Sequence, residues 1–213
     1  MTMNPLKSSQ SNIGRACGIL TGVPVVIVAG AFVAFAAAGV LENPAENILP
    51  ALPILAFSLA FLAVGLVIVL AGLIPWIAGM RVARPDISLS AGAVRVGEGF
   101  TVHYAQTFRR TSEVRDIRLR LILRERATYR HGKSSSTVTY EEVAAEFEFP
   151  AKTYEAGEQL SFSRGMEIPR GGMHTFRGHR NRIEWLLRAK VEIAGWPDYL
   201  EDFELAVEPA MAG

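Results

Sequence analysis

The sequence predicts a membrane-anchored protein in which an α-helical transmembrane hairpin precedes an all-β antiparallel sandwich. Three observations support this prediction. No charged residue occurs from residue 16 to 41 or from 47 to 80. All but Lys7 and Arg15 of the 22 basic residues, and all but Glu42 and Glu46 of the 21 acidic residues, lie after residue 80. Beyond residue 85, apolar and polar side chains alternate with the period of two that half-buried strands require.

The two uncharged stretches are long enough to cross a bilayer. The hydrocarbon core is about 30 Å thick and a helix rises about 1.5 Å per residue, so a span needs roughly 20 apolar residues. After an N-terminal tail of residues 1–17, we expect the hairpin over residues 18–80, with spans at 18–41 and 52–78 and an external loop at 42–50. A loop this short makes the two helices antiparallel neighbours.

Small residues recur in both spans, where they allow helices to pack closely in lipid. They are Gly14, Gly18, Gly22, Gly30, Ala34 and Ala38 in the first span and Ala56, Ala60 and Ala63 in the second. Two interpretations remain open: a specific packing seam, or the ordinary composition of membrane helices.

The charges that flank the spans predict their orientation. Lys7 and Arg15 precede the first span and Arg81 and Arg84 follow the second, whereas the loop carries only acidic residues. The positive-inside rule then places both termini in the cytoplasm, as a two-pass protein of the plasma (inner) membrane. The alternative is a signal peptide cleaved after residue 38, whose apolar region would be unusually long. In that case too the second span leaves the following domain inside.

Short strands replace helices in residues 85–209, which a tail of residues 210–213 follows. The alternation, with glycine and proline at segment boundaries, predicts eight strands, at residues 87–89, 93–96, 100–108, 114–126, 137–149, 159–168, 183–193 and 203–207. Such a series is typical of an antiparallel sandwich of the Ig-like class. Trp185 and Leu187 face one way and Leu186 the other, so we expect only one of these sets to be buried.

The strands at 114–126 and 137–149 form a pair whose register the charges specify. If their hairpin folds about Lys133, arginines on one strand oppose glutamates on the other, in the pairs Arg118–Glu148, Arg120–Glu146 and Arg124–Glu142. Exposed pairs of this kind contribute about 0.2–1 kcal/mol each. They therefore favour a role in setting register over an anion-binding face.

Motifs for metals and phosphate loops are weak. Cys17 is the only cysteine, which excludes an intramolecular disulfide. The tripeptide Gly132-Lys133-Ser134 lacks the glycine that a phosphate-binding loop places five residues earlier. His174 and His179 have no obvious third metal ligand near them in the sequence. We therefore expect no metal and no cofactor.

Enzyme activity has little support in the sequence, and we expect a non-enzymatic protein without a small-molecule substrate. A competing hypothesis is a hydrolase, which requires a pocket that gathers Asp198, His174 and Glu184. The net charge of +1 also gives no reason to expect nucleic-acid binding.

One stretch of the chain, residues 164–188, is locally basic. Its candidate binding residues, for lipid headgroups or a protein partner, are Arg170, Arg177, His179, Arg180 and Arg182. The alternative is an ordinary polar loop over residues 171–181, with arginines that are solvated or paired with acids. The short linker after the second span is expected to keep this surface close to the membrane.

Several motifs in residues 85–209 resemble the arrestin-like β-sandwich family. They are Ile168-Pro169, the segment His174-Thr175-Phe176-Arg177-Gly178, the strand segment Trp185-Leu186-Leu187, and the closing Val207-Glu208-Pro209, with Val96-Gly97-Glu98 upstream. The match covers a single sandwich, and the two preceding spans depart from the family pattern. The resemblance implies non-enzymatic scaffolding through contacts with proteins or membranes.

Two functional hypotheses follow. The first is a membrane-anchored interaction or scaffold module that presents a β-sandwich at the inner membrane surface, with membrane lipids and a protein as partners. The alternative is an accessory subunit or assembly factor of a membrane complex, recognised through its transmembrane hairpin.

Overall fold

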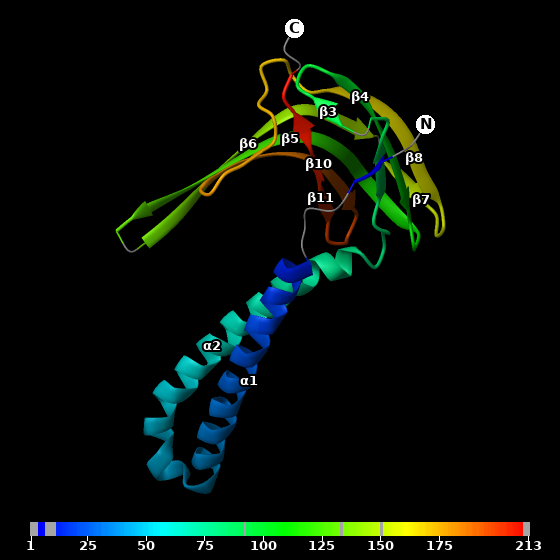
Figure 1. The fold of residues 1–213 in the computed structure, drawn as a ribbon. Coiled ribbons are helices and arrows are strands. Elements are labelled where there is room, and N and C mark those ends of the chain that lie inside the picture. Colours follow the sequence, from blue (N-terminus) through cyan, green and yellow to red (C-terminus); the bar gives the residue numbers. More distant parts are fainter. Residues whose placement is uncertain (1–3, 7–11, 92, 133, 150, 211–213) are drawn as a thin grey trace. The chain divides into compact units, whose positions relative to one another are not determined.

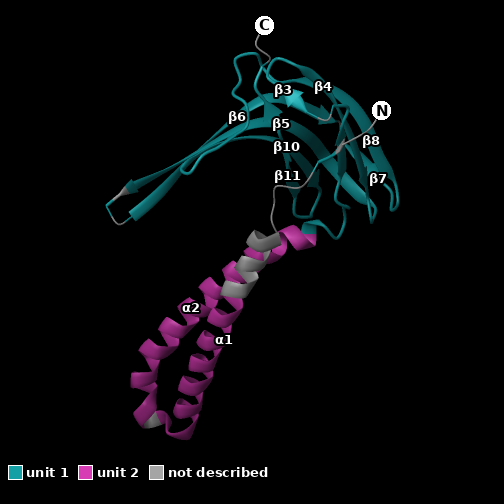
Figure 2. Ribbon diagram, in the orientation of Figure 1, with its two compact units in different colours: residues 1–10, 78–213 teal, residues 11–77 magenta. Residues whose placement is uncertain are grey.

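The computed structural model describes residues 4–6, 12–91, 93–132, 134–149 and 151–210, coloured along the chain in Figure 1. The chain divides into two compact units, shown in two colours in Figure 2. One, here called the helical unit, is Ser11–Ile77, and the other, the β unit, is Met1–Gln10 with Ala78–Gly213. Most of the expected terminal tails, and Lys133 at the expected hairpin turn, lie outside the described residues.

The helical unit contains α1 (Asn12–Glu42) and all of α2 (Pro44–Ala78) except its last residue, and the two helices are separated by Asn43 alone. The loop expected over residues 42–50 is therefore wrong, because α2 already begins at Pro44. Proline fits the first position of a helix, where its missing N–H has no partner to lose. The Gly39 carbonyl near the end of α1 accepts hydrogen bonds from the Asn43 backbone N–H at 3.3 Å and from the Asn47 side-chain amide at 2.8 Å.

Both helices are long and apolar enough to cross a membrane. The qualifying segments are Gly22–Glu42, with a mean hydropathy of 2.4, and Glu46–Ala78, with a mean hydropathy of 2.9. Both segments meet this condition by their length and composition. The coarse prediction of two long apolar N-terminal helices is confirmed.

The two helices lie close together at two glycines. A Cβ added at Gly22 would lie 2.8 Å from the Val69 Cγ2 atom, and one added at Gly65 would lie 2.9 Å from the Val26 Cγ2 atom. Each glycine belongs to a buried series of small residues at heptad spacing, Gly22, Ala29 and Ala36 on α1 and Ala51, Ser58 and Gly65 on α2. The helices pack along these two series.

This seam differs from the expected one at most positions. Ala34 and Ala38 are exposed, as are Ala56, Ala60 and Ala63, and nothing lies within 4 Å of a Cβ added at Gly30. The side-chain surroundings of Gly14 and Gly18 lie outside the described residues. Small residues are so frequent in both helices that composition alone does not identify the packed face.

The β unit contains two antiparallel sheets (Figure 1). The four-stranded sheet has the order β1-β2-β4-β8, with β1 at Asn4–Pro5, β2 at Asp86–Leu89, β4 at Gly99–Thr107 and β8 at Gln159–Glu167. The six-stranded sheet has the order β11-β10-β5-β6, with β11 at Tyr199–Leu205, β10 at Asn181–Ile193, β5 at Ser112–His131 and β6 at Ser134–Phe149. Its remaining strands are β7 (Lys152–Tyr154), which pairs with β5, and β9 (Phe176–Arg177), which pairs with β10. β3 (Val94–Arg95) and β12 (Val207–Glu208) form a parallel pair.

The main hydrophobic core lies between the two sheets. Side chains from both sheets contribute to it, among them Phe100, Val102 and Tyr104 from the four-stranded sheet and Leu119, Leu121, Trp185, Leu187 and Phe203 from the six-stranded one. The Trp185 indole is 1% exposed, and its Nε1 donates a hydrogen bond of 2.7 Å to the Met173 carbonyl. The prediction of mostly antiparallel sheets after the helices is confirmed.

The expected register between β5 and β6 is confirmed from Ile117 to Leu121 of β5. Arg118 pairs with Glu148 and Arg120 with Glu146, as the charge pattern predicts. Both pairs form ion pairs, with a distance of 3.1 Å from Arg118 Nε to Glu148 Oε1 and 2.8 Å from Arg120 Nη2 to Glu146 Oε1.

The third expected pair, Arg124–Glu142, is wrong. A β-bulge between Leu121 and Ile122 leaves Ala144 as an extra residue on β6, and beyond it the register shifts so that Arg124 pairs with Glu141. The hairpin turn contains Gly132, whose φ of 61° lies in the left-handed region that glycine enters without strain.

The short strands β1, β7 and β9 have no counterpart among the eight expected ones, and the last expected strand is split into β11 and β12. Strands of two or three residues show no alternation that a sequence pattern would reveal. β5 and β6 are longer than expected, because their paired ends reach into polar sequence around the turn.

Candidate functional site

The outer face of the six-stranded sheet, which points away from the core, carries a series of charged side chains. On β5 they are Arg118, Arg120, Arg124 and Arg126, and on β10 they are Arg182, Glu184, Arg188, Lys190 and Glu192. Two apolar side chains, Ile122 and Leu186, lie among these charges as a directly opposed pair. They are nevertheless 1% and 0% exposed, respectively.

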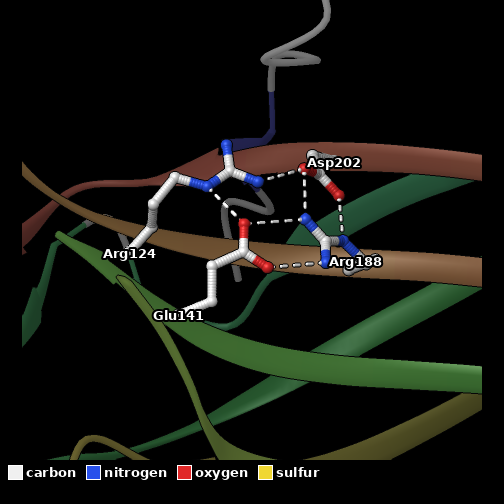
Figure 3. A network of polar contacts seen from close by, with 4 residues as sticks. All are labelled: Arg124, Glu141, Arg188 and Asp202. Atoms are coloured by element: carbon white, nitrogen blue, oxygen red, sulfur yellow. Dashed lines mark hydrogen bonds and ion pairs between the residues drawn. The ribbon is translucent and has the colours of Figure 1, made fainter. Parts of the chain in front are cut away.

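Four charged residues from four strands form a closed network near this apolar pair (Figure 3). Arg124 Nε lies 2.7 Å from Glu141 Oε1, and Arg124 Nη2 lies 2.9 Å from Asp202 Oδ2. Arg188 Nε lies 2.7 Å from Asp202 Oδ1, and Arg188 Nη1 lies 2.9 Å from Glu141 Oε2. Two guanidinium groups thus face two carboxylates, and the network as a whole carries no net charge.

The register explains how this network buries Leu186. Arg124 stands opposite Glu184 on β10, whereas Asp202 stands opposite Arg188. The contact between Arg124 and Asp202 therefore runs diagonally across the intervening position, which Leu186 occupies. The expectation that only one set of side chains around Trp185 is buried is consequently wrong, since Trp185, Leu186 and Leu187 are all buried.

The network also shifts the ionisation of its members. The hydrogen bond from Arg188, with further help from Arg124, lowers the pKa of the Glu141 carboxyl. Burial acts to raise the pKa of Asp202, but hydrogen bonds and charges of Arg188 and Arg124 outweigh it, so the pKa of Asp202 lies below its ordinary value. The hydrogen bond to Asp202 in turn raises the pKa of Arg188. These shifts keep Glu141 and Asp202 ionised and Arg188 protonated at neutral pH, so the ion pairs of the network stabilise the sheet.

The segment that follows α2 is bound into the β unit by buried polar groups. The Tyr104 hydroxyl donates a hydrogen bond to Gln106 Oε1, and Gln106 Nε2 donates one of 2.9 Å to the carbonyl of Ala83. Burial raises the pKa of the Tyr104 phenol well above its ordinary value, and the nearby Tyr199, Tyr154 and Glu201 raise it further. Tyr104 therefore stays protonated and acts as a donor.

The next residue of this segment pairs with a buried carboxylate. Arg84 Nε lies 3.1 Å from Glu201 Oε1, and the Glu201 side chain is 3% exposed. The Tyr199 hydroxyl donates a second hydrogen bond to Glu201. Arg84 also lies over the ring of Phe203. This buried carboxylate is satisfied by its partners and holds Arg84 against the β unit.

Earlier residues of the same segment pack into a second hydrophobic cluster of the β unit. Ala78 and Val82 are 2% and 0% exposed in this cluster. The backbone N–H of Arg109 donates a hydrogen bond of 2.8 Å to the Arg81 carbonyl, and Arg81 lies over the ring of Trp196. The segment of residues 78–84 is therefore an integral part of the β unit.

The five predicted basic residues are all exposed, but the structure does not bring all of them together. Arg170 follows β8, and its side chain lies near Gly97, in the turn between β3 and β4. Arg177 lies on β9, Arg180 directly precedes β10, and Arg182 lies on β10, with His179 between Arg177 and Arg180 in the chain. Two of the arginines are paired, Arg177 with Glu204 and Arg182 with Glu184, the latter at 3.2 Å.

The register adds an arginine that the sequence reasoning missed. Arg182 of β10 stands directly opposite Arg177 of β9 on one side and Arg126 of β5 on the other. These three residues, here called the arginine row, lie side by side across three strands. The β5–β10 register, which sequence patterns did not supply, is the only signal that would have revealed Arg126.

The pocket that the hydrolase hypothesis requires is not formed. Glu184 lies near the start of β10 and pairs with Arg182, whereas Asp198 lies beyond the other end of β10 and pairs with Lys190 at 3.3 Å. Within the described part of the chain, no group of three or more histidine, cysteine or acidic residues is placed to hold a metal ion.

A histidine and a serine form a hydrogen bond on the exposed side of the four-stranded sheet. His103 Nδ1 lies 2.7 Å from Ser163 Oγ, and the two residues are paired in the register of β4 and β8. They line a shallow groove of about 440 Å³ that also includes Asp86. The sequence analysis did not single out this pair.

Comparisons with known proteins find similarity among solved structures alone. No protein-family model matches this chain, and no curated protein matches its sequence. Among solved structures, the chain is similar to the crystal structure of Spo0M, a sporulation control protein from Bacillus subtilis, with a TM-score of 0.48 and 18% sequence identity. The similarity covers 60% of this chain and 49% of that one, so this chain spans about half the length of the solved protein.

Proposed function

We propose that this protein is a non-enzymatic, membrane-anchored interaction module that presents an arrestin-like β-sandwich at the inner membrane surface. Two helices long and apolar enough to span a membrane support the anchoring. Basic residues before α1 and after α2, against acidic residues between them, support a cytoplasmic location for both termini.

The observation that carries the proposal is the integration of residues 78–84 into the β unit. The chain passes from α2 into this segment without intervening residues, and Ala78, Val82 and Arg84 are each held by contacts within the β unit. An anchored module with no free linker remains near the bilayer, where its effective concentration for membrane partners is high.

A partner surface is available on β6, the edge strand of the six-stranded sheet. β6 pairs with β5 on one side, and no other described strand pairs with it. Three large apolar side chains on β6 are about half exposed: Val138 at 54%, Tyr140 at 58% and Val143 at 48%. Edge strands of this kind accept an extended segment as an additional strand. We take an extended segment of a protein partner as the occupant.

The test uses the full chain solubilised from its native membranes. A photoreactive residue at Val138 should crosslink the partner, and Val138→Lys should abolish its co-purification because a charge opposes apolar packing across the new strand pair. Leu200→Lys is the matched control, since Leu200 is 43% exposed on β11, the other edge strand of the same sheet. Equal partner recovery from both variants would refute the assignment to β6.

A groove in the helical unit favours the alternative function, an accessory subunit recognised through its helices. The groove has a volume of about 770 Å³ and lies between Pro24, Val28 and Phe32 of α1 and Pro53, Phe57 and Phe61 of α2. An apolar helix of a membrane complex fits this lining. Replacing residues 18–77 with an unrelated hairpin separates the two functions, because only the first survives the exchange.

A further inference from the structure

The arginine row places three like charges next to one another on one sheet face. Directly paired residues of neighbouring strands point to the same side, so the side chains of Arg177, Arg182 and Arg126 project together. Like charges at directly opposed positions destabilise a sheet. This arrangement is therefore not explained by the stability of the protein alone.

Acidic side chains compensate part of this charge. Arg177 pairs with Glu204 and Arg182 with Glu184, whose side chains are 30% and 6% exposed. Arg126 is partly buried and has no acidic partner among the described residues. The row thus keeps a positive charge that only a ligand or the solvent compensates.

The surroundings of the row add charge and hydroxyl groups. Arg130 follows Arg126 on the same face of β5, and the Arg180 carbonyl accepts a hydrogen bond of 2.8 Å from the N–H of Thr128, which lies between them on β5. Arg130 and Arg180 are exposed and have no ion-pair partner in the described ranges. The Thr128 and Thr137 hydroxyls lie 3.0 Å apart on this face.

This chemistry selects the type of ligand. A guanidinium group donates two parallel hydrogen bonds to an oxyanion, and several guanidinium groups together favour an anion with more than one charge. A phosphate monoester carries about two negative charges and three strong acceptor oxygens. Hydroxyl donors beside the arginines suit the remaining oxygen atoms.

We infer that the arginine row, together with Arg130 and Arg180, binds a phosphate-bearing ligand. The phosphate belongs to either a lipid headgroup or a soluble phosphate ester, which share this chemistry. The lipid source rests on the proposed function, because it requires the β unit to be held near a bilayer, whereas the soluble source does not.

The test measures thermal unfolding of the β unit in the full chain, reconstituted into nanodiscs of neutral lipid. Inorganic pyrophosphate should raise the unfolding temperature of the unmodified protein. Arg126→Glu should raise it without any anion, since glutamate opposite Arg182 replaces a repulsion by an attraction, and should abolish the response to pyrophosphate. Arg126→Gln should weaken pyrophosphate binding about fivefold, as expected for the loss of one basic residue.

Arg115→Glu is the matched control, because it makes the same change of charge at an exposed position near the other end of β5. It should leave the pyrophosphate response intact. The inference is overturned if the unmodified protein shows no response, or if Arg126→Glu lowers the unfolding temperature and retains the response.

Two further arms separate the ligand sources. If the ligand is a headgroup, nanodiscs that contain a phosphoinositide should raise the unfolding temperature of the unmodified protein, and added pyrophosphate should then have no further effect. If the ligand is a soluble ester, the same nanodiscs should leave the response to pyrophosphate unchanged. The two proposals can fail separately. If no partner crosslinks at Val138 but the unmodified protein responds to pyrophosphate, the partner surface on β6 is refuted and the phosphate site is supported.

Discussion

Individual charged residues on the outer face act differently according to their burial. The side chains of Arg124 and Asp202 are each 9% exposed, whereas those of Arg120 and Glu146 are 31% and 32% exposed. A pair removed from water depends on its partner for solvation, while an exposed pair exchanges its partner for water at little cost. Two ion pairs of the same kind, each an arginine with a carboxylate, thus have unequal roles on one sheet.

Asp202→Asn is predicted to destabilise the β unit strongly. The substitution leaves Arg124 and Arg188 with one carboxylate for two guanidinium groups, and breaking a buried pair costs about 3–5 kcal/mol. Chemical denaturation of the full chain in detergent measures the free energy of unfolding. Glu146→Gln is the control and should change it by less than about 1 kcal/mol. Equal effects of the two substitutions would contradict the role assigned to the network.

The stability of the β unit is predicted to fall in acid. The folded state lowers the pKa values of Asp202 and Glu141, so in this range the unfolded chain binds more protons than the folded one. The stabilisation is complete above the unfolded pKa values of about 4 and is lost as the pH falls through the lowered folded values. Denaturation at a series of acidic pH values measures this loss.

The same titration has an internal control. In Asp202→Asn the slope of unfolding free energy against pH should be shallower in acid than in the unmodified protein, because one of the two depressed carboxyl groups is gone. An unchanged slope would show that other carboxyl groups dominate the acid response.

At the scale of elements, local sequence patterns predict the two helices and part of one strand pairing. The apolar stretches identify α1 and α2, and the charge alternation on β5 and β6 identifies Arg118–Glu148 and Arg120–Glu146 as pairs. The pattern fails at Arg124, because a single extra residue, Ala144, shifts the register without leaving a mark such as glycine or proline. Pro44 has the opposite effect: it favours the prediction of a loop, but proline is compatible with the first position of a helix, and α2 begins there.

Gly65→Val is predicted to destabilise the helical unit. A Cβ at this position would lie 2.9 Å from the Val26 Cγ2 atom and 3.2 Å from the Val26 backbone N, so the helices must move apart. Overpacking of this kind costs about 1–3 kcal/mol. A disulfide crosslink between cysteines introduced on α1 and α2 reports their separation. Ala63→Val is the control at an exposed position of the same helix and should leave crosslinking unchanged.

At the scale of the whole chain, the register between strands that are distant in sequence determines which side chains become neighbours. Arg126 joins Arg182 and Arg177 only because β5 and β10, far apart in sequence, pair with one particular alignment. Leu186 is fully buried at the position that the contact from Arg124 to Asp202 crosses. Side chains on one strand are predictable from alternation, but neighbours on different strands depend on the alignment of strands that sequence periodicity leaves open.

The segment at residues 78–84 is likewise more than a connection. A sequence reading treats it as a short linker because Arg81, Arg84 and Pro85 interrupt the apolar pattern. In the structure Val82 forms a bridge with Phe108 and is fully buried, and Gln106 holds the Ala83 carbonyl. Its positions are therefore set by the β unit, in which Ala78 and Val82 are buried and the residues between them are partly or fully exposed.

Inserting Gly-Ser-Gly between Val82 and Ala83 is predicted to destabilise the β unit itself, rather than merely to lengthen the tether. The insertion displaces either Val82 from its hydrophobic cluster or Arg84 from the buried Glu201 carboxylate, and a buried carboxylate without its partner is costly. The same insertion after Gly132, in the exposed turn of the β5–β6 hairpin, is the control. Thermal unfolding of the full chain should show a marked loss of stability for the first insertion and little change for the second. If the insertion at residue 82 is tolerated as well as the one at residue 132, the segment is a flexible linker, and the observation that carries the proposed function is lost.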